Sequence, residues 1–110
     1  MAKISDTALT GISGRTYMFG VFTLDVNFRN MGAVYVFAHR TLDPLGQERH
    51  HPIYVGQTSE LGDWLSGHRD WPLLKQKKAN CVCVHIDWNE NLRAKIENDL
   101  IGYYHPPCNN

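Results

Sequence analysis

A short run of apolar residues, Gly32 to Ala38, most limits how this chain can fold. The run is far shorter than the ~20 residues of a membrane-spanning helix, and polar and apolar side chains do not alternate in it. Such a segment is typical of a central β-strand that is buried on both faces. The chain has 110 residues, enough for one domain around that strand with a core that needs no disulfides.

The segments around this strand have residue patterns typical of further β-strands and of α-helices. Residues 16–25, 53–55 and 81–86 are rich in β-branched and aromatic side chains and are expected to be strands. Helices are predicted after Ser59, over 73–78, and from Asn89 to a stop before Pro106. The sequence therefore predicts an α+β fold, with an antiparallel or mixed sheet of about three to four strands flanked by about three helices. Residues 1–15 are expected to form a loose arm, 16–110 a single domain, and 39–51 a hairpin loop.

Charge and cysteine content exclude some classes of protein. Eleven basic residues balance eleven acidic residues, which is not the pattern of a strongly basic nucleic-acid binder. The candidate contact for a polyanion is Arg69 with the cluster Lys75, Lys77 and Lys78, although such a cluster is equally typical of a solvated face. Three cysteines do not make a disulfide framework, and no long apolar run follows Lys3. We therefore expect a cytoplasmic protein with reduced thiols and no membrane segment.

Two groups of residues have a combined order and spacing that is quite specific. The first group is Ala33-Val34-Tyr35 on one strand, Tyr54-Val55-Gly56 at the end of another, and His68 at the end of the next helix. The second is Glu97 in the last helix, followed by Pro106-Pro107 and Asn109. From about Gly32 to Asn109, the chain resembles the GIY-YIG nuclease family.

The resemblance implies a set of roles. In that family a small sheet carries two tyrosines, and the domain cuts phosphodiester bonds with one divalent metal ion. Tyr35 and Tyr54 would lie on adjacent antiparallel strands and activate water, and Glu97 would hold the metal. His68 would assist proton transfer or phosphate binding, and Asn109 would help to order the site. A single carboxylate with waters suits Mg²⁺, or Mn²⁺ in its place.

The resemblance also implies partners. Nucleic acid, DNA more than RNA, is the expected substrate, and the neutral net charge makes a homodimer or a protein partner plausible. Considered alone, tyrosines are ordinary strand residues and Glu97 could be a solvated helix residue. The resemblance favours the functional interpretation.

Trp64 departs from the family pattern, which has an arginine at this position. The chain has no Lys or Arg between Arg49 and Arg69, and loss of a catalytic guanidinium can cost roughly 3–7 kcal/mol of barrier lowering. Arg40, His50, His51 and Arg69 are the candidates to compensate. Two hypotheses follow: a weakened Mg²⁺-dependent endonuclease, or a domain that has lost catalysis and binds nucleic acid or a protein.

Cysteine and histidine side chains also alternate on one strand. Cys81, Cys83 and His85 fall on one face and, with Cys108, could form a zinc set. Zinc sites usually separate their cysteines by two to four residues, so small buried hydrophobes are the favoured interpretation. His50 is expected to lie on the surface of the long loop.

Overall fold

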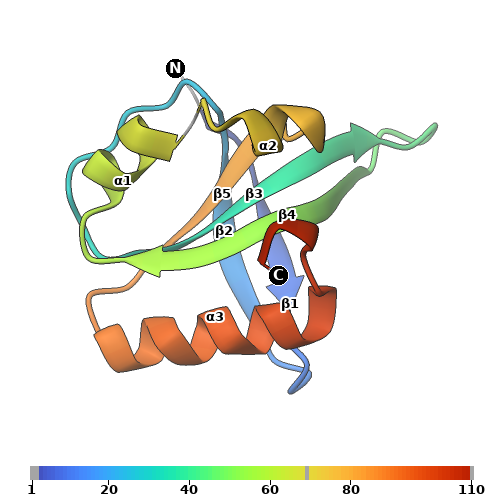
Figure 1. Cartoon of the computed structure of the whole chain (residues 1–110). Coiled ribbons are helices and arrows are strands. Elements are labelled where there is room, and N and C mark those ends of the chain that lie inside the picture. Colours follow the sequence, from blue (N-terminus) through green and yellow to red (C-terminus); the bar gives the residue numbers. More distant parts are fainter. Residues whose placement is uncertain (1–2, 69, 110) are drawn as a thin grey trace.

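The computed structural model describes residues 3–68 and 70–109. The described residues form a five-stranded antiparallel sheet in the order β1-β2-β5-β3-β4 (Figure 1). Its strands are β1 (Lys3–Thr10), β2 (Thr16–Thr23), β3 (Ala33–Leu42), β4 (Glu48–Thr58) and β5 (Cys81–Ile86). The α+β class is confirmed, and the sheet has one strand more than the upper expected number.

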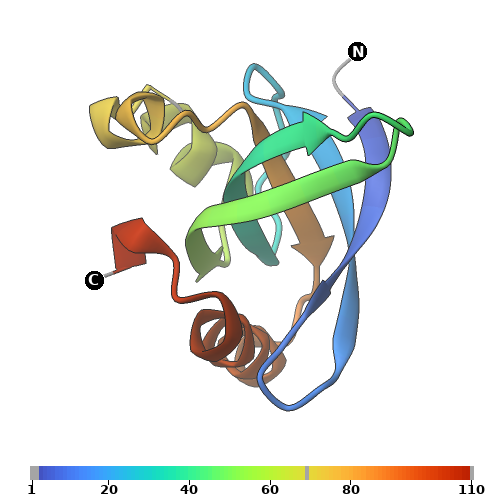
Figure 2. The same cartoon turned by 90° about the vertical axis from the view of Figure 1, so that its right-hand side faces the viewer.

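Three helices and one short 3₁₀ turn surround this sheet: α1 (Leu61–His68), α2 (Pro72–Gln76), α3 (Glu90–Tyr104) and η1 (Pro107–Asn109). Helices α1 and α2 pack on one face of the twisted sheet and α3 on the other, with η1 next to β4 (Figures 1 and 2). Asn89 caps α3, because its side chain accepts a hydrogen bond from the Leu92 amide, as predicted. No helix in the described ranges is long and apolar enough to cross a membrane.

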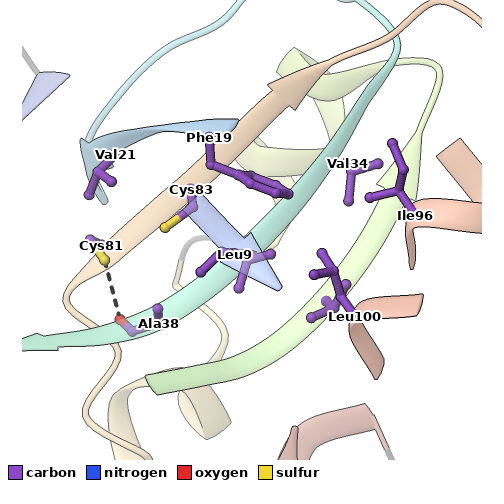
Figure 3. Packing of buried hydrophobic residues seen from close by; sticks show 11 residues of the cluster. Leu9, Phe19, Val21, Val34, Ala38, Cys81, Cys83, Ile96 and Leu100 are labelled. Atoms are coloured by element: carbon purple, nitrogen blue, oxygen red, sulfur yellow. Dashed lines mark hydrogen bonds between the residues drawn. The ribbon is translucent and has the colours of Figure 1, made fainter. Parts of the chain in front are cut away.

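Strand β3 is the central strand that its apolar sequence predicts. It pairs with β5 on one side and β4 on the other, and residues 33–38 are buried. Alternate side chains of β3 enter two separate cores. Val34, Val36 and Ala38 face the core that α3 covers, in which Ile96 and Leu100 also lie (Figure 3). Tyr35 and Phe37 face the second core, under α1 and α2.

The expectation that residues 1–15 form a loose arm is wrong for Lys3–Thr10, which form strand β1. Strand β1 pairs with β2 along its length, and only its Leu9 is buried. Contacts with α3 hold the hairpin, because the Thr10 amide donates to the Tyr104 hydroxyl (3.0 Å) and the Ser13 hydroxyl donates to Asp99 (2.6 Å). A polar segment is a strand here because of long-range pairing, which local propensity does not reveal.

The hairpin loop expected over residues 39–51 is also much shorter. Strand β3 continues to Leu42 and β4 begins at Glu48, so the turn covers only residues 43–47. The Asp43 carboxylate accepts from two turn amides, and Gly46 adopts the left-handed conformation. An ion pair between Arg40 and Glu48 holds the two strands beyond the apolar part of the hairpin. Cross-strand charge pairing therefore extends the strands through polar residues.

Candidate functional site

Tyr35 is the buried centre of the candidate site, with 2% of its surface exposed. Its partner on β4 is Gly56, and a Cβ atom added to Gly56 would lie 2.3 Å from the Tyr35 hydroxyl oxygen. Any side chain at position 56 would therefore collide with the phenol. The glycine lets the Tyr35 ring cross the backbone of β4, the strand at this edge of the sheet.

Tyr54 lies diagonally opposite Tyr35 on the same face of the sheet. It pairs with Phe37 on β3, and the two tyrosine rings have centroids 6.2 Å apart and planes inclined by 27°. Tyr54 is half-buried, and its ring also packs edge-on against Trp71. The structure therefore brings the two tyrosines together on adjacent antiparallel strands.

Glu97, on α3, lies close enough to Tyr35 for its charge to act on the Tyr35 pKa. Burial raises the pKa of the Glu97 carboxyl, and no side chain in the described ranges forms a hydrogen bond or ion pair with it. The pKa of Tyr35 lies well above its usual range, first because the ring is buried and then because Tyr54 and Glu97 add negative charge nearby. No cation among the described residues lowers the pKa of Tyr35 or of Glu97. Within residues 3–68 and 70–109, the site is therefore a half-buried acid beside a buried phenol, with no cation that acts on either pKa.

Trp64 fills the space above the tyrosines. Its ring centroid lies 4.1 Å from that of Tyr35 and 6.0 Å from that of Tyr54, and it is parallel to the Tyr54 ring within 6°. Helix α1 holds it there because Leu61 and Leu65 are buried in the second core. An apolar indole thus covers the position at which the family pattern has a guanidinium.

His68 lies beyond Trp64 rather than against the tyrosines. The His68 and Trp64 rings stack at 3.9 Å and are parallel within 6°. The His68 Nδ1 atom is 2.8 Å from the Trp64 carbonyl oxygen, one turn earlier in α1. If Nδ1 donates to that carbonyl, Nε2 is left as the free acceptor. Its ring contacts among the described residues run to Trp64 alone, so Trp64 separates this histidine from the two phenols.

Asn109 ties the end of the chain to β4. Its side-chain amide bonds both backbone groups of Val55, accepting from the amide and donating to the carbonyl, each at 2.8 Å. These two bonds satisfy the outer edge of β4 directly beside Tyr54. Asn109 therefore positions the strand and has no contact with a reacting group.

The predicted basic cluster lies at the end of α2 and in the turn after it. Lys75, Lys77 and Lys78 are all exposed, and Lys78 adopts the left-handed conformation. Lys77 lies close enough to Cys108 in η1 for its positive charge to lower the pKa of the Cys108 thiol. Burial of the thiol has the larger effect, so this pKa is raised. The cluster therefore borders η1 and the β4 edge. Arg69, the fourth predicted contact, lies outside the described residues.

The sequence analysis missed one charged residue of this region. Arg93 in α3 is 4% exposed, and its guanidinium donates to the Gln57 side chain (2.9 Å) and to the Asp87 carbonyl (3.0 Å). It anchors α3 against the end of β4, next to Gly56. An arginine one turn before Glu97 was a possible signal, but only the fold shows that it is buried.

The structure does not bring together the four residues that were weighed as a zinc set. Cys81 and Cys83 lie in the first core, whereas Cys108 packs against the second. The His85 Nδ1 atom is 2.8 Å from the Met18 carbonyl oxygen. The expectation for His50 is wrong, because only 4% of its side chain is exposed.

Comparison with known proteins adds no relative. No protein-family model, curated protein or solved structure matches the chain.

Proposed function

We propose that this domain hydrolyses phosphodiester bonds in nucleic acid, DNA in preference to RNA, with one divalent metal ion at Glu97. The observation that carries the proposal is that Glu97 lies near enough to Tyr35 to raise its pKa, while the Tyr35 ring packs against that of Tyr54. The acid comes from the last helix and the phenols from the middle of the chain. Such a convergence of polar groups with raised pKa values is typical of functional sites.

The carboxyl of Glu97 fits a magnesium-type ion. It is half-buried, it lacks a partner among the residues described, and oxygen ligands with retained waters are what Mg²⁺ prefers. A divalent ion bound there, Mg²⁺ or Mn²⁺, would supply the positive charge that phosphoryl oxygens need during hydrolysis. It would also favour the ionised carboxylate, whose burial without a partner is otherwise unfavourable.

The two tyrosines would have different roles. Because its pKa is strongly raised, Tyr35 stays protonated at neutral pH and can donate a hydrogen bond but cannot accept a proton. Tyr54 is partly exposed, so its hydroxyl can orient a water molecule or a phosphate oxygen. Asn109 would hold β4, and with it Tyr54, at a fixed position.

Nucleic acid would reach the site past the exposed end of α2. Lys75, Lys77 and Lys78 can neutralise backbone phosphates, and each such contact makes binding weaker at higher salt. Because the net charge of the chain is zero, we expect weak binding by this domain alone. A second copy or a protein partner would supply further contacts.

A second function is favoured by Trp64. The indole packs directly on Tyr35 and Tyr54, and no cation in the described part of the chain compensates for the missing guanidinium. If nothing replaces that charge, the barrier rises by roughly 3–7 kcal/mol. The domain would then be a binding module for nucleic acid or a protein.

Cleavage of supercoiled plasmid and of structured oligonucleotides with Mg²⁺ or Mn²⁺ tests the proposal. We expect slow cleavage that Glu97→Gln and Tyr35→Phe abolish and that Trp64→Arg accelerates. The matched controls are Glu90→Gln and Tyr103→Phe, which change exposed residues of α3. Equal cleavage by parent and Glu97→Gln would overturn the assignment. If parent and Trp64→Arg are both silent but retain nucleic acid in a salt-sensitive way, the binding module is supported instead.

A further inference from the structure

Two thiols and an imidazole converge on the opposite face of the sheet. The Cys81 and Cys83 side chains of β5 lie in the first core among apolar side chains (Figure 3). His50 comes from β4, two strands away. One ligand atom from each of the three residues lies within 4.8 Å of the other two. No expectation from sequence combined His50 with these cysteines.

A small residue on the strand between them makes this convergence possible. Ala38 of β3 pairs with Cys81 on one side and with Pro52 on the other. Its methyl group leaves room for the imidazole of His50 to extend over β3 toward the thiols. The Cys81 thiol lies 3.6 Å from the Ala38 carbonyl, which keeps it at this level of the strand.

The imidazole is buried without a partner. Only 4% of the His50 side chain is exposed, and Nε2 has no hydrogen-bond partner within residues 3–68 and 70–109. The nearest carboxylate oxygen, from Glu48, is 3.9 Å away, which is too far for a hydrogen bond. A buried polar nitrogen left unpaired costs about 1–3 kcal/mol. A ligand bound at His50 Nε2 would therefore remove this cost.

We propose that His50, Cys81 and Cys83 bind one thiophilic metal ion of the Zn²⁺ class. In a tetrahedral zinc site with bonds of about 2.0–2.3 Å, neighbouring ligand atoms are roughly 3.3–3.8 Å apart. The ligand atoms of His50, Cys81 and Cys83 already lie within 4.8 Å of one another, so small side-chain rotations would give them the spacing of a zinc site. Two thiolates and a neutral imidazole would balance the charge of a divalent ion, so the complex would be neutral inside an apolar core.

The surroundings favour this ion over a magnesium-type ion. Sulfur and imidazole are soft or borderline ligands, whereas Mg²⁺ requires oxygen. The fourth ligand would be the Glu48 carboxylate, of which one oxygen lies 3.9 Å from His50 Nε2, or water from a hollow of about 270 Å³ that Thr7, Leu9, Glu48, His50 and Tyr104 help to line. That hollow gives the ion a route from solvent. This site is separate from the candidate site at Tyr35 and Tyr54, because those tyrosines lie in the core on the other face of the sheet.

A disulfide between the two cysteines is a poorer use of the same thiols. Residues i and i+2 of a strand have Cα atoms about 6.6–6.8 Å apart, at the upper limit for a disulfide. Strand β5 is also paired on both sides, with β2 and β3, so it cannot easily shorten. Reduced thiols that share an ion fit this backbone better.

Titration of the reduced full chain with Co²⁺, followed by competition with Zn²⁺, tests the site. We expect a sulfur-to-cobalt charge-transfer band in the near ultraviolet that saturates at one equivalent of Co²⁺ per chain and is lost when Zn²⁺ is added. His50→Gln and Cys83→Ser should weaken binding by more than about 100-fold, beyond the effect of losing an outer partner. Zn²⁺ should also raise the Tm of the parent protein.

Matched variants keep the test decisive. Cys108→Ser and His85→Gln remove a thiol and an imidazole that lie elsewhere, so they should bind as the parent does. If Cys83→Ser fails to fold, His50→Gln still decides, because it leaves both thiols in place. Absence of the thiolate band, or its persistence in His50→Gln, would overturn the proposal. Glu97→Gln should bind Co²⁺ at this site unchanged, so failure of the nuclease proposal would not affect the result.

Discussion

Replacement of Gly56 by alanine tests whether the Tyr35 phenol really crosses β4. The new Cβ would lie 2.3 Å from the Tyr35 hydroxyl oxygen and 2.5 Å from the ring carbon that carries it. The ring cannot easily retreat, because Trp64 packs on it at 4.1 Å and Phe37 lies at 6.2 Å between centroids. Overpacking of this kind costs about 1–3 kcal/mol, and we expect the upper end because both neighbours are fixed by the core.

A double-mutant cycle identifies the cause of that loss. Tyr35→Leu alone should cost about 2–4 kcal/mol, since it leaves a cavity under Trp64. If the phenol is the only obstacle, adding Gly56→Ala to Tyr35→Leu should cost almost nothing, a coupling of about 2–3 kcal/mol. Urea unfolding followed by circular dichroism gives each free energy of unfolding.

The control is Gly67→Ala in α1, where an added Cβ meets no atom within 4 Å. Alanine should stabilise this helix by up to about 1 kcal/mol. Additive effects of Gly56→Ala and Tyr35→Leu, within about 0.5 kcal/mol, would refute the argument that the ring lies over Gly56.

Three further predictions concern the ties between α3, η1 and the sheet. Asn109→Ala removes two hydrogen bonds to the β4 edge and should lower the free energy of unfolding by about 1–3 kcal/mol, with faster proteolysis of the last residues. Hydrogen bonds from Ser13 and Tyr17 lower the pKa of the Asp99 carboxyl below its ordinary value of 3.8. Its contribution to stability is therefore complete above about pH 4 and is lost as pH falls further, so Asp99→Asn should flatten the acid limb of a stability–pH curve. Arg93→Met should destabilise the fold by about 1–3 kcal/mol, because the half-buried Gln57 side chain and the Asp87 carbonyl lose their donor. Thermal unfolding at neutral pH measures this loss of stability.

Parts of the fold that depend on local pattern were predictable from the sequence. The apolar run from Gly32 to Ala38 identified the central strand, and Asn89 identified the start of α3. Strand β5 was predicted with its observed bounds, because it is a short β-branched segment between polar turns. In each of these cases a single period or cap is enough to specify the element.

Long-range pairing was not predictable. Strand β1 has a polar sequence with one buried residue, so nothing local distinguishes it from a loose arm. The polar half of the β3–β4 hairpin is held by an ion pair between Arg40 and Glu48, which lie eight residues apart in the sequence. Interactions that form only when two segments meet leave little signal in either segment alone.

The candidate site divides in the same way. The approach of Tyr35, Tyr54 and Glu97 was expected only through the resemblance to a family, and its use in catalysis stays a prediction. The stacking of His68 on Trp64 was not predicted. Helical spacing shows which face of a helix a side chain lies on, but it does not show which rings stack on each other. The prediction for His50 was wrong because it placed this residue in a loop over residues 39–51. His50 instead belongs to β4, and its side chain is buried.

The clamp that Asn109 forms has a practical consequence for engineering this chain. Any polypeptide fused after the C-terminus would start beside Tyr54, at the mouth of the candidate site. The N-terminal strand β1 forms the other edge of the sheet, and Figure 2 shows the two termini on opposite sides of the molecule. Affinity tags and fluorescent fusions therefore belong at the N-terminus, on the edge of the sheet away from the candidate site.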